Sequence, residues 1–566
     1  MADAKYDRLM ARVSELTSER RTTETTWQEI ADNLLGRRDF TTERSKGQQR
    51  LQTVYDDTSK VSGGLLAGAM HSLLTSPSAR WFSLRFEDHM VQESPNAAIW
   101  LKAAEKRMYA AIGAPKANFH AQLSEAYIDL IYFGTGALFI DDIPGTGVQF
   151  SARPLSELFL SEDPSGRIDT VVREFQLTAR QAVSIWGDKA TSASKALNSG
   201  KAEDKAKYVQ IILPNDDVTA GKVDTSGMPW ASIHISMTDK AILSEGGFHE
   251  LPIATPRWEK DAGEVYGRGP GWNALATQKM LNEMKKVTIK AGQKAVDPPL
   301  MVDSEGVLPG DLRFHPGGVI PINSIMSSMN PPIQAIPNGG NFNISVALIE
   351  DARKSVQDSF HHQLIETIRD PRMTATQVLE LSAQMQRHLA PILGRMQTEM
   401  LEPIVERVFA IEARAGRLPE APPEIAEQNL KIDYVSPVAR AQQTSDARAI
   451  IDFSGIVSNL AQVNPEVLDI IDFDAGTREL ADSLGVPPTM LRSRADVETR
   501  REAAQQLAAQ QEAEQQAVAH NVRYRQAVLE RISEVALQHA EQPNEILFDR
   551  RAVETVLLSQ ELQTLP

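Results

Sequence analysis

A stretch that cannot be helical lies between two segments with a helical pattern, and this arrangement limits the possible folds most. Residues 297–343 read DPPLMVDSEGVLPGDLRFHPGGVIPINSIMSSMNPPIQAIPNGGNFN, where proline and glycine recur too often for a helix. Several short runs within this stretch suit extended strands. In residues 270–291 and again in 344–366, apolar residues recur at spacings of three and four. The sequence therefore predicts two helices separated by a module of turns and short strands.

A second break follows in LIETIRDPRMTATQVLE, residues 364–380. Pro371 disfavours helical geometry at Asp370 and cannot donate a backbone hydrogen bond, so we expect it to end the second helix. Thr374 begins TATQ, a capping-box sequence in which the Thr374 hydroxyl and the Gln377 side chain satisfy backbone donors reciprocally. A new helix is therefore predicted over 375–415, and we expect it to bend at its two internal prolines.

The remainder of the chain divides into helical and β-rich parts. The first 135 residues are predicted to be helical, with the clearest periods over 5–35, 61–77 and 119–134. Residues 136–260 contain short β-rich runs bounded by Gly, Pro and Asp, which predict antiparallel strands with one inserted helix near 178–199. After a plausible boundary at GRLPEAPPE, the chain is again mostly helical.

The last predicted helix has an unusual composition. Residues 492–539 are dominated by Ala, Gln, Glu and Arg, with little Gly or Pro and few large apolar side chains. A helix that is polar on all sides is rarely stable alone. We therefore expect this segment either to pack against copies of itself or to fray.

Composition excludes several classes of protein. The 566 residues include no cysteine, which rules out disulfides, thiolate metal sites and a cysteine nucleophile and fits a protein made in reducing cytoplasm. The first residues are charged and predict no signal peptide, and no run of eighteen apolar residues predicts a bilayer span. A net charge of −16 argues against a sequence-specific nucleic-acid binder, although an acidic protein can still enclose DNA that it must not hold.

Two glycine-rich stretches resemble nucleotide-binding loops but lack the features that such loops need. YGRGPGW, residues 266–272, lacks the GxxxxGK[ST] pattern, and Pro270 removes a backbone N–H that a phosphate site would use. A tight turn that places Trp272 in a core is the favoured interpretation. FGTGALF, residues 133–139, runs into a predicted strand, which is the wrong context for dinucleotide binding.

Candidate metal ligands are equally weak. His361 and His362 are adjacent, so on a helix they point about 100° apart and cannot easily share one ion. The pairs Asp56–Asp57 and Asp141–Asp142 have no third ligand at a defined spacing, and solvated turns or helix caps are the favoured interpretation. No nucleophile elbow, HExxH motif or kinase motif set is present. We therefore expect no enzyme activity, cofactor or metal.

Several stretches together resemble one family, the portal or head-to-tail connector proteins of short-tailed bacteriophages. They occur in the family's order and cover most of the chain to about residue 500, and they are specific as a set. The stretches are WQEIADNLLGRRDF (27–40), YDDTSKVSGGLLAGAMHSLLTSPSARWFSL (55–84), LSEAYIDLIYFGTGALFID (123–141), PRWEKDAGEVYGRGPGWNALATQKMLNEM (256–284) and YVSPVARAQQ (434–443).

This resemblance implies an α+β, mainly helical, portal-type subunit with wing, stem, clip and crown, which forms a ring around a central channel. The implied parts follow the predicted elements. They are a wing over 1–265 (helical over 1–135, β-rich over 136–260), a first stem helix over 266–291, a clip over 292–343, a second stem helix over 344–366, a tunnel loop over 367–374, a long kinked wing helix over 375–415, a crown over 416–491 and a C-terminal helical crown or barrel over 492–566.

The resemblance also implies a function. Portal proteins of this type form a homo-oligomeric ring, usually of about twelve copies, at one vertex of the capsid. The terminase drives double-stranded DNA through the ring without sequence specificity, a tail adaptor binds it later, and the genome leaves through it. Major capsid and scaffolding proteins are further implied partners, and a membrane is not. The implied location is the virion, after assembly in the host cytoplasm, and the ring itself is not the ATPase.

Three sets of candidate residues follow. The tunnel loop nearest the DNA would comprise Thr367, Ile368, Arg369, Asp370, Pro371, Arg372, Met373 and Thr374. A docking surface on the clip would include Val307, Leu308, Arg313, Phe314 and Ile320. Basic residues of the first stem helix, which either face the channel or pair with acids of the adjacent subunit, are Lys279, Lys285, Lys286, Lys290 and Lys294.

Mixed charge in an acidic channel has a mechanical consequence. Lysine-dense walls would bind phosphates by releasing counterions and would stall the DNA, whereas acidic walls with a few arginines hold it nowhere for long. Arg369 and Arg372 would then make transient phosphate contacts without reading bases. The alternative for these arginines is a salt bridge with Asp370 or with Glu366 of a neighbour.

Two other classes of protein compete with the portal interpretation. A nucleotide-dependent packaging enzyme would need the phosphate loop and carboxylate cluster that the sequence lacks, and an ATPase assay distinguishes it. Another virion structural protein, such as a shell or scaffold component, would not need a Pro/Gly-rich module between two stem helices. Mass measurement of the purified assembly separates these possibilities.

Replacing both Arg369 and Arg372 with Glu tests the tunnel loop. We expect the double variant to fold and form rings like the parent, because exposed substitutions usually change the free energy of unfolding by no more than about 0.5 kcal/mol. It should package or retain DNA poorly, with the defect easing as salt is raised, because the added negative charges lie within a Debye length of about 8 Å of the phosphates. Ring yield and packaged DNA length measure the two effects.

A different result would reassign these arginines. Impaired ring assembly or a lower melting temperature, with no separate packaging defect, would make them structural salt-bridge residues. Normal packaging by well-formed rings would remove them from the channel altogether.

Overall fold

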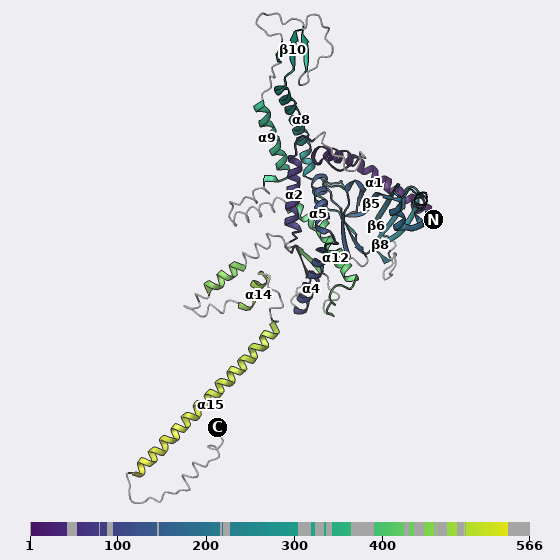
Figure 1. The fold of residues 1–566 in the computed structure, drawn as a ribbon. Helices are drawn as coiled ribbons and strands as arrows, with labels where there is room; N and C mark the ends of the chain where they lie inside the picture. Colours follow the sequence, from purple (N-terminus) through teal and green to yellow (C-terminus); the bar gives the residue numbers. More distant parts are fainter. Residues whose placement is uncertain are drawn as a thin grey trace. The chain divides into compact units, whose positions relative to one another are not determined.

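The computed structural model describes the chain in two compact units, Met1–Val486 and Pro487–Pro566, each considered by itself. The described residues are 2–41, 54–77, 80–87, 94–143, 147–215, 218, 227–303, 318–322, 333–335, 342–363, 390–423, 430–434, 447–457, 460, 472–483, 492 and 494–540. The fold is mostly helical with some sheet, which confirms the predicted α+β class at this level (Figure 1).

The predicted N-terminal helices are present. They are α1 (Ala2–Ile30), which continues into a π-helical turn at Ala31–Leu35, α2 (Thr58–Leu74) and α5 (Phe119–Phe133), with α4 (Pro95–Ile112) between the last two. The prediction that residues 1–135 are helical throughout was wrong at one place, because β1 (Phe82–Phe86) pairs antiparallel with β13 (Leu430–Tyr434). Its partner lies far along the chain, so no local pattern indicated this pairing.

The β-rich region forms two antiparallel sheets, as predicted. One has the order β3-β2-β9 (Gly147–Ala152, Leu138–Ile143 and Ile253–Ala254) and the other is the meander β4-β5-β6-β7-β8 (Leu158–Glu162, Ile168–Thr178, Lys205–Pro214, Trp230–Ser236 and Ala241–Phe248). The inserted helix is present as two short helices, α6 (Ala179–Trp186) and α7 (Thr191–Asn198). Gly187 separates them with a left-handed φ of 58°, and a capping box of Thr178 and Gln181 begins α6.

Helices cover both faces of the five-stranded sheet. On one face, Leu9, Val13 and Leu16 of α1 are buried in a cluster with Val172 and Val209 of the sheet. On the other face, the small residues of α6 and α7 pack in a cluster with Tyr208 and Leu243. Because a sheet face must be covered to exclude water, this packing fixes α1 across the wing strands.

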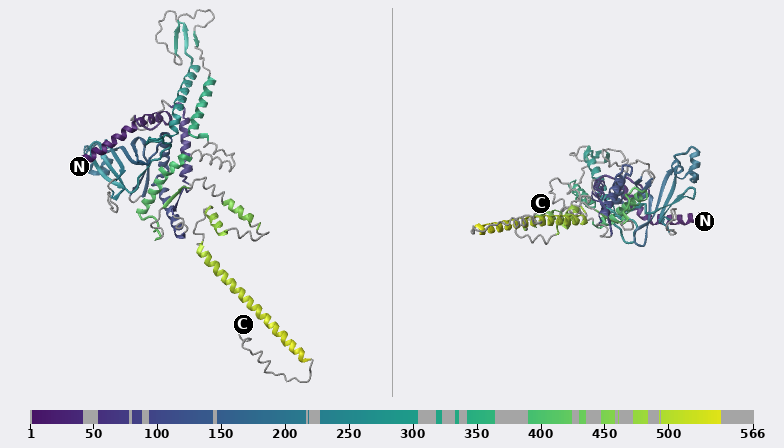
Figure 2. Two further views of the ribbon diagram at one scale, coloured as in Figure 1. Left: turned by 180° about the vertical axis from the view of Figure 1, so that it is seen from behind. Right: turned by 90° about the horizontal axis from the view of Figure 1, so that it is seen from below.

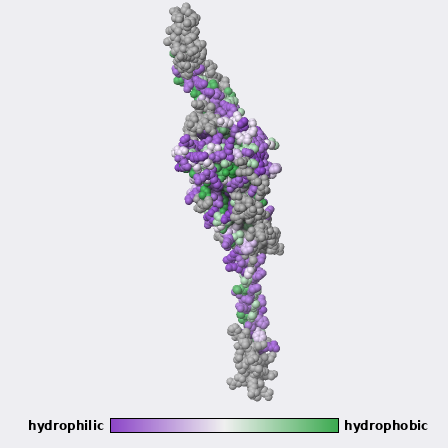
Figure 3. All heavy atoms as spheres, turned by 90° about the vertical axis from the view of Figure 1, so that its right-hand side faces the viewer, coloured by the Kyte–Doolittle hydropathy of each residue, from purple (hydrophilic) through white to green (hydrophobic). Residues whose placement is uncertain are grey.

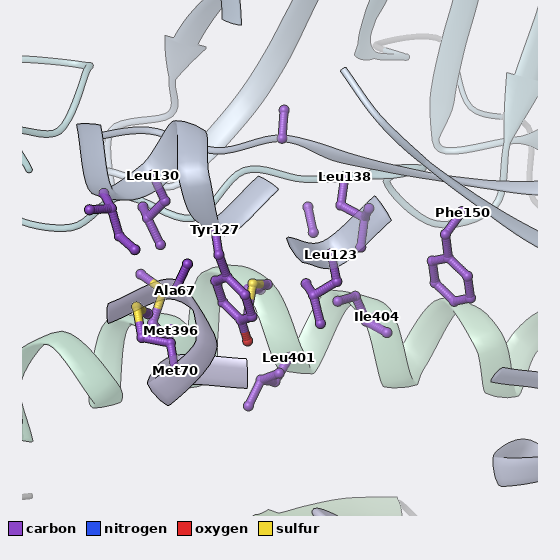
Figure 4. Packing of buried hydrophobic residues seen from close by; sticks show 14 of the residues in the cluster. Ala67, Met70, Leu123, Tyr127, Leu130, Leu138, Phe150, Met396, Leu401 and Ile404 are labelled. Carbon is purple, nitrogen blue, oxygen red and sulfur yellow. The ribbon is translucent and has the colours of Figure 1, made fainter. Parts of the chain in front are cut away.

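The largest core lies between α2, α5 and α12 (Glu402–Arg414). Tyr127 of α5 is fully buried among Met70, Met396 and Leu401 in the region shown in Figure 4. Its hydroxyl lies 3.3 Å from the Thr75 hydroxyl, so the buried polar atom has a partner. The long helix predicted over 375–415 is described from residue 390, and it contains a π-helical turn at Gln397–Leu401 directly before α12.

The end of α5 crosses the start of α8 (Pro270–Val296) with the two backbones in direct contact. A Cβ added at Gly267, Gly269 or Gly271 would lie closer than 3.0 Å to backbone atoms of residues 130–134. Gly134 adopts a left-handed φ of 85°, and a Cβ there would meet the backbone of Gly267. The YGRGPGW stretch is therefore a packing element, as the favoured interpretation held.

Two indole groups complete this crossing. Trp27 and Trp272 each donate an Nε1–H hydrogen bond of 3.0 Å to the carbonyl oxygen of Phe133. This carbonyl belongs to the last turn of α5, where helical backbone acceptors have no partner within the helix. The prediction that Trp272 enters a core is confirmed, since it packs against the main cluster.

Beyond the crossing, α8 and α9 (Phe342–Ser359) lie side by side as a helical hairpin (Figures 1 and 2). The short strands predicted between them are present as β10 (Leu300–Asp303), β11 (Val319–Ile322) and β12 (Ile333–Ala335), in the order β11-β10-β12. Strands β10 and β11 are parallel, whereas β10 and β12 are antiparallel.

The prediction of one unbroken helix over 344–366 was wrong at residues 360–361, whereas its predicted end at Pro371 lies outside the described residues. Helix α9 ends at Ser359, and His361 adopts a left-handed φ of 53°. Phe360 between them is fully buried, with its ring centroid 5.7 Å from that of Tyr132. Packing of Phe360 into the body therefore accompanies the end of α9 at Ser359, and residues 362–363 are helical again.

Residues 447–457 are also helical, and the remaining helices are α14 (Phe473–Ser483) and, in the second unit, α15 (Arg494–Ala540), which confirms the long helix predicted near 492–539. Nearly all of the described side chains of α15 are exposed. Hydrophilic residues cover most of the described surface in the view of Figure 3. Among the described residues, no helix has the length and apolar character needed to span a bilayer.

The glycine crossing can be tested with a matched pair of variants. Gly267→Ala should lower the free energy of unfolding by about 2 kcal/mol or more, because its methyl group would overlap the Gly134 carbonyl oxygen. Gly64→Ala, on the exposed face of α2 with no atom within 4 Å of the new Cβ, should raise it by about 0.5–1 kcal/mol. Urea unfolding measures both, and equal effects would show that the crossing tolerates a side chain.

Candidate functional site

One buried carboxylate joins both helices of the α8–α9 hairpin to the start of α2. Asp56, just before α2, accepts hydrogen bonds from the Nη2 and Nε atoms of Arg353 at 2.8 and 3.0 Å, and Arg353 belongs to α9. The Nζ atom of Lys285, on α8, lies 3.4 Å from the same carboxylate oxygen. Because the side chains of Lys285 on α8 and Arg353 on α9 contact the same oxygen, the position of one helix along the other is fixed at Asp56.

The backbone around Asp56 is held by two buried polar side chains of α8. The Asn282 side-chain oxygen accepts hydrogen bonds from the backbone N–H groups of Tyr55 and Asp56 at 3.1 and 3.2 Å. Gln278 donates to the Asp56 carbonyl oxygen at 3.0 Å. Neither Gln278 nor Asn282 is exposed, so α8 cannot rotate about its axis without leaving buried polar groups unsatisfied.

The environment of Asp56 favours its charged form. Burial acts to raise its pKa, but hydrogen bonds from Thr58 and Arg353 together lower the pKa below its ordinary value. The interpretation of Asp56 as part of a solvated turn was therefore wrong in one respect: Asp56 accepts a hydrogen bond from the backbone N–H of Thr58 at the start of α2, but it is buried. Two cationic side chains occupy the position that a metal ion would need, and no metal-binding group of three ligands occurs among the described residues.

The five stem lysines separate into two groups. Lys279 pairs with Glu29 at 3.1 Å, Lys285 with Asp56, and Lys286 with Glu283 at 2.8 Å, all within one chain. Lys290 and Lys294, nearer the strand module, form no ion pair with any residue that the structure describes.

The other predicted site residues are placed only in part. The tunnel-loop residues 367–374 lie outside the described residues, as do Val307, Leu308, Arg313 and Phe314 of the predicted docking surface. Ile320 lies on β11, in register with Met301 of β10.

The comparisons with known proteins agree on one family. The family model described as "Bacteriophage head to tail connecting protein" matches residues 6–491. The chain belongs to this family. It is 30% identical over 542 residues to the portal protein of Salmonella phage epsilon15, which covers 92% of this chain and 96% of that protein. It is also 30% identical over 523 residues to the probable portal protein of Bordetella phage BPP-1, covering 89% and 92%.

A second buried charge in this connector-family chain ties the β-rich region to the helix that contains Glu399. Arg257 is 1% exposed and donates to Glu399 through Nε at 3.1 Å and through Nη2 at 2.6 Å. It also pairs with Glu162 at the end of β4 and donates to the carbonyl oxygen of Gly166. Glu399 belongs to the π-helical turn, so the extra backbone residue there accompanies a buried ion pair.

Both buried ion pairs were missed by the sequence analysis. Asp56 and Arg353 lie far apart in the sequence, as do Arg257 and Glu399, and no spacing rule links them. The only local signal was the Asp-Asp-Thr-Ser sequence at 56–59, which is typical of a helix start. A cap of this kind is usually exposed, so burial could not be inferred from it.

The Asp56 site predicts a pH-dependent stability. A carboxylate whose pKa is lowered in the folded state stabilises the fold above its ordinary pKa of about 3.9, and this contribution is lost as the pH falls through the folded value. Asp56→Asn should therefore lower the free energy of unfolding at pH 7 by about 1–3 kcal/mol. The difference from the parent should shrink as the pH falls below about 4.

The adjacent residue provides the control. Asp57 is exposed and forms no ion pair with the described residues, so Asp57→Asn should change stability by no more than about 0.5 kcal/mol. Chemical denaturation at several pH values measures both variants. Equal effects of the two substitutions, or a loss in Asp56→Asn that persists at low pH, would contradict the assigned role of the charge.

Proposed function

We propose that this chain is the subunit of a phage portal, the ring at one capsid vertex through which the genome is packaged and later ejected. The observation that carries this proposal is the family match over residues 6–491, together with two relatives of nearly the same length that are named portal proteins. The helical hairpin α8 and α9, with a strand module at its end, supplies the stem and clip that such a subunit needs.

A channel wall built from hairpins must resist the passing DNA, and the root of this hairpin is suited to that task. Asp56 holds both helices, and Gln278 and Asn282 prevent rotation of the first. The glycine crossing below them leaves no space for α8 to slide against α5. Force applied to the stem would therefore reach the wing through rigid contacts.

The charge of the chain fits transient contact with DNA. With a net charge of −16, the acidic ring would repel the duplex weakly, while Arg369 and Arg372 of the tunnel loop would contact phosphates briefly. The DNA is bound without sequence specificity in this proposal. Translocation is driven by the terminase, and the ring has no nucleotide site of its own.

The clip is proposed as the docking surface, first for the terminase and then for a tail adaptor. Val307, Leu308, Arg313 and Phe314 lie in the sequence between β10 and β11, and Ile320 lies on β11. The wing would contact major capsid and scaffolding proteins during assembly in the host cytoplasm. The mature location is the portal vertex of the virion.

Mass measurement of the purified protein tests the proposal. We expect rings of about twelve subunits with a central hole in electron micrographs, because a heterologous contact that closes produces a cyclic oligomer. The same preparation should not hydrolyse ATP. A monomer with ATPase activity would favour a packaging enzyme, and a closed shell or filament would favour another structural role.

A further inference from the structure

The α8–α9 hairpin carries two exposed faces, one with two lysines and one with two aspartates that form no ion pair with the described residues, and the position of each follows from the Asp56 site. Helices α8 and α9 run in opposite directions along the hairpin (Figure 2). Lys285 and Arg353 reach the same carboxylate oxygen, so we take them as the common reference height on the two helices. Heights of other residues then follow from the helical rise of about 1.5 Å per residue.

The first face, which we call the basic stripe, lies on α8 and comprises Met280, Glu283, Val287, Lys290 and Lys294. Their spacings of three, four, three and four place them along one line of the helix, and Glu283 is paired with Lys286 of the same helix. Met280 and Val287 are 52% and 60% exposed, which is unusual for apolar residues of these types. Lys290 and Lys294 have no ion-pair partner among the described residues.

The second face, the acidic stripe, lies on α9 and comprises Leu348, Asp351, Ser355 and Asp358. These residues also follow one line, at spacings of three, four and three, and all four are exposed; Lys354, also exposed, lies on the same side between the two aspartates. Leu348 is 53% exposed. Neither aspartate forms an ion pair with a residue that the structure describes.

The two stripes cannot cover each other within one chain. The side of α9 that packs into the hairpin and body is formed by Ile349, Ala352 and Val356, all buried, and the acidic stripe lies outside that side. A rotationally repeated copy would place the outer face of one hairpin beside the opposite outer face of the next. Exposed apolar residues flanked by complementary charges are what such a contact requires.

We propose that the basic stripe of α8 packs against the acidic stripe of α9 in the adjacent copy, an inference that rests on the proposed ring. Lys290 lies about 7.5 Å above the Asp56 level and Asp351 about 3 Å above it, so they differ by about 4.5 Å. Val287 and Leu348 lie at about 3 and 7.5 Å. When the two copies stand at equal height, Lys290 is level with Leu348 and Val287 is level with Asp351. The Lys290 side chain then reaches along the helix axis to Asp351, and Val287 packs against Leu348 in the same way.

This contact answers the question that the sequence left open for the stem lysines. Lys279, Lys285 and Lys286 have acidic partners within the chain. Lys290 pairs with the adjacent copy and does not face the DNA. The stem is thus closed by a contact whose strength depends on salt concentration, because its ion pairs lie near solvent.

Charge reversal with rescue tests this contact. Lys290→Glu and Asp351→Lys each place like charges opposite one another at every interface, so each should lower the fraction of chains in rings about tenfold or more at low salt, which corresponds to at least about 1.4 kcal/mol. The double variant restores opposite charges and should recover ring formation. Mass photometry measures the ring fraction, and circular dichroism confirms that each chain is folded.

The matched control is Lys201→Glu, which reverses an exposed lysine in the turn before β6 and should leave ring formation unchanged. Rings that form normally in both single variants, or a double variant that is no better than either, would overturn the contact. Normal rings of Lys290→Glu with altered DNA packaging would place this lysine in the channel and leave the portal function intact. A parent chain that forms no rings would overturn the portal proposal itself.

Discussion

The close approach of the backbone at Gly134 to the backbone at Gly267 is the constraint on which the rest of the structure depends. It leaves no room for a side chain at Gly134 or at Gly267. The distance between the end of α5 and the start of α8 is therefore fixed. The Phe133 carbonyl, which would lack a helical partner, accepts hydrogen bonds from Trp27 and Trp272. The first helix, the core helix and the stem helix are therefore joined at one atom.

The α8–α9 hairpin starts from this crossing. Helix α8 leaves the crossing in a set direction, and Asp56 then sets the position of α9 against it through Arg353 and Lys285. Both contacts lie at the root of the hairpin. Farther along, the hairpin carries exposed apolar residues and charged residues that form no ion pair with the described part of the chain. A subunit that is rigid at its root and incomplete along its outer faces is suited to assembly side by side, as the proposed ring requires.

Most of the secondary structure could be predicted because its signals are local. The three-and-four period of α1, α5 and α8, the alternation in the wing strands and the Pro/Gly-rich stretch before α9 each depend on neighbouring residues. The errors arose where distant residues decide the outcome. Strand β1 needs β13 as its partner, and α9 ends where Phe360 packs against Tyr132. The candidate site shows the same difference, since the two helices of the α8–α9 hairpin were predicted but the Asp56 contacts at its root were not.

The sequence by itself determined most of the order of helices and strands, the two helices around the Pro/Gly-rich stretch, the absence of cysteine chemistry and the resemblance to one family. These properties depend only on composition and on spacings of a few residues. Only the tertiary structure decided which charges are structural, because Asp56 is similar to Asp57 in the sequence but is buried between two helices that arrive from elsewhere in the chain. Burial makes the difference, since a carboxylate removed from water must find cationic partners, and those partners are supplied by folding.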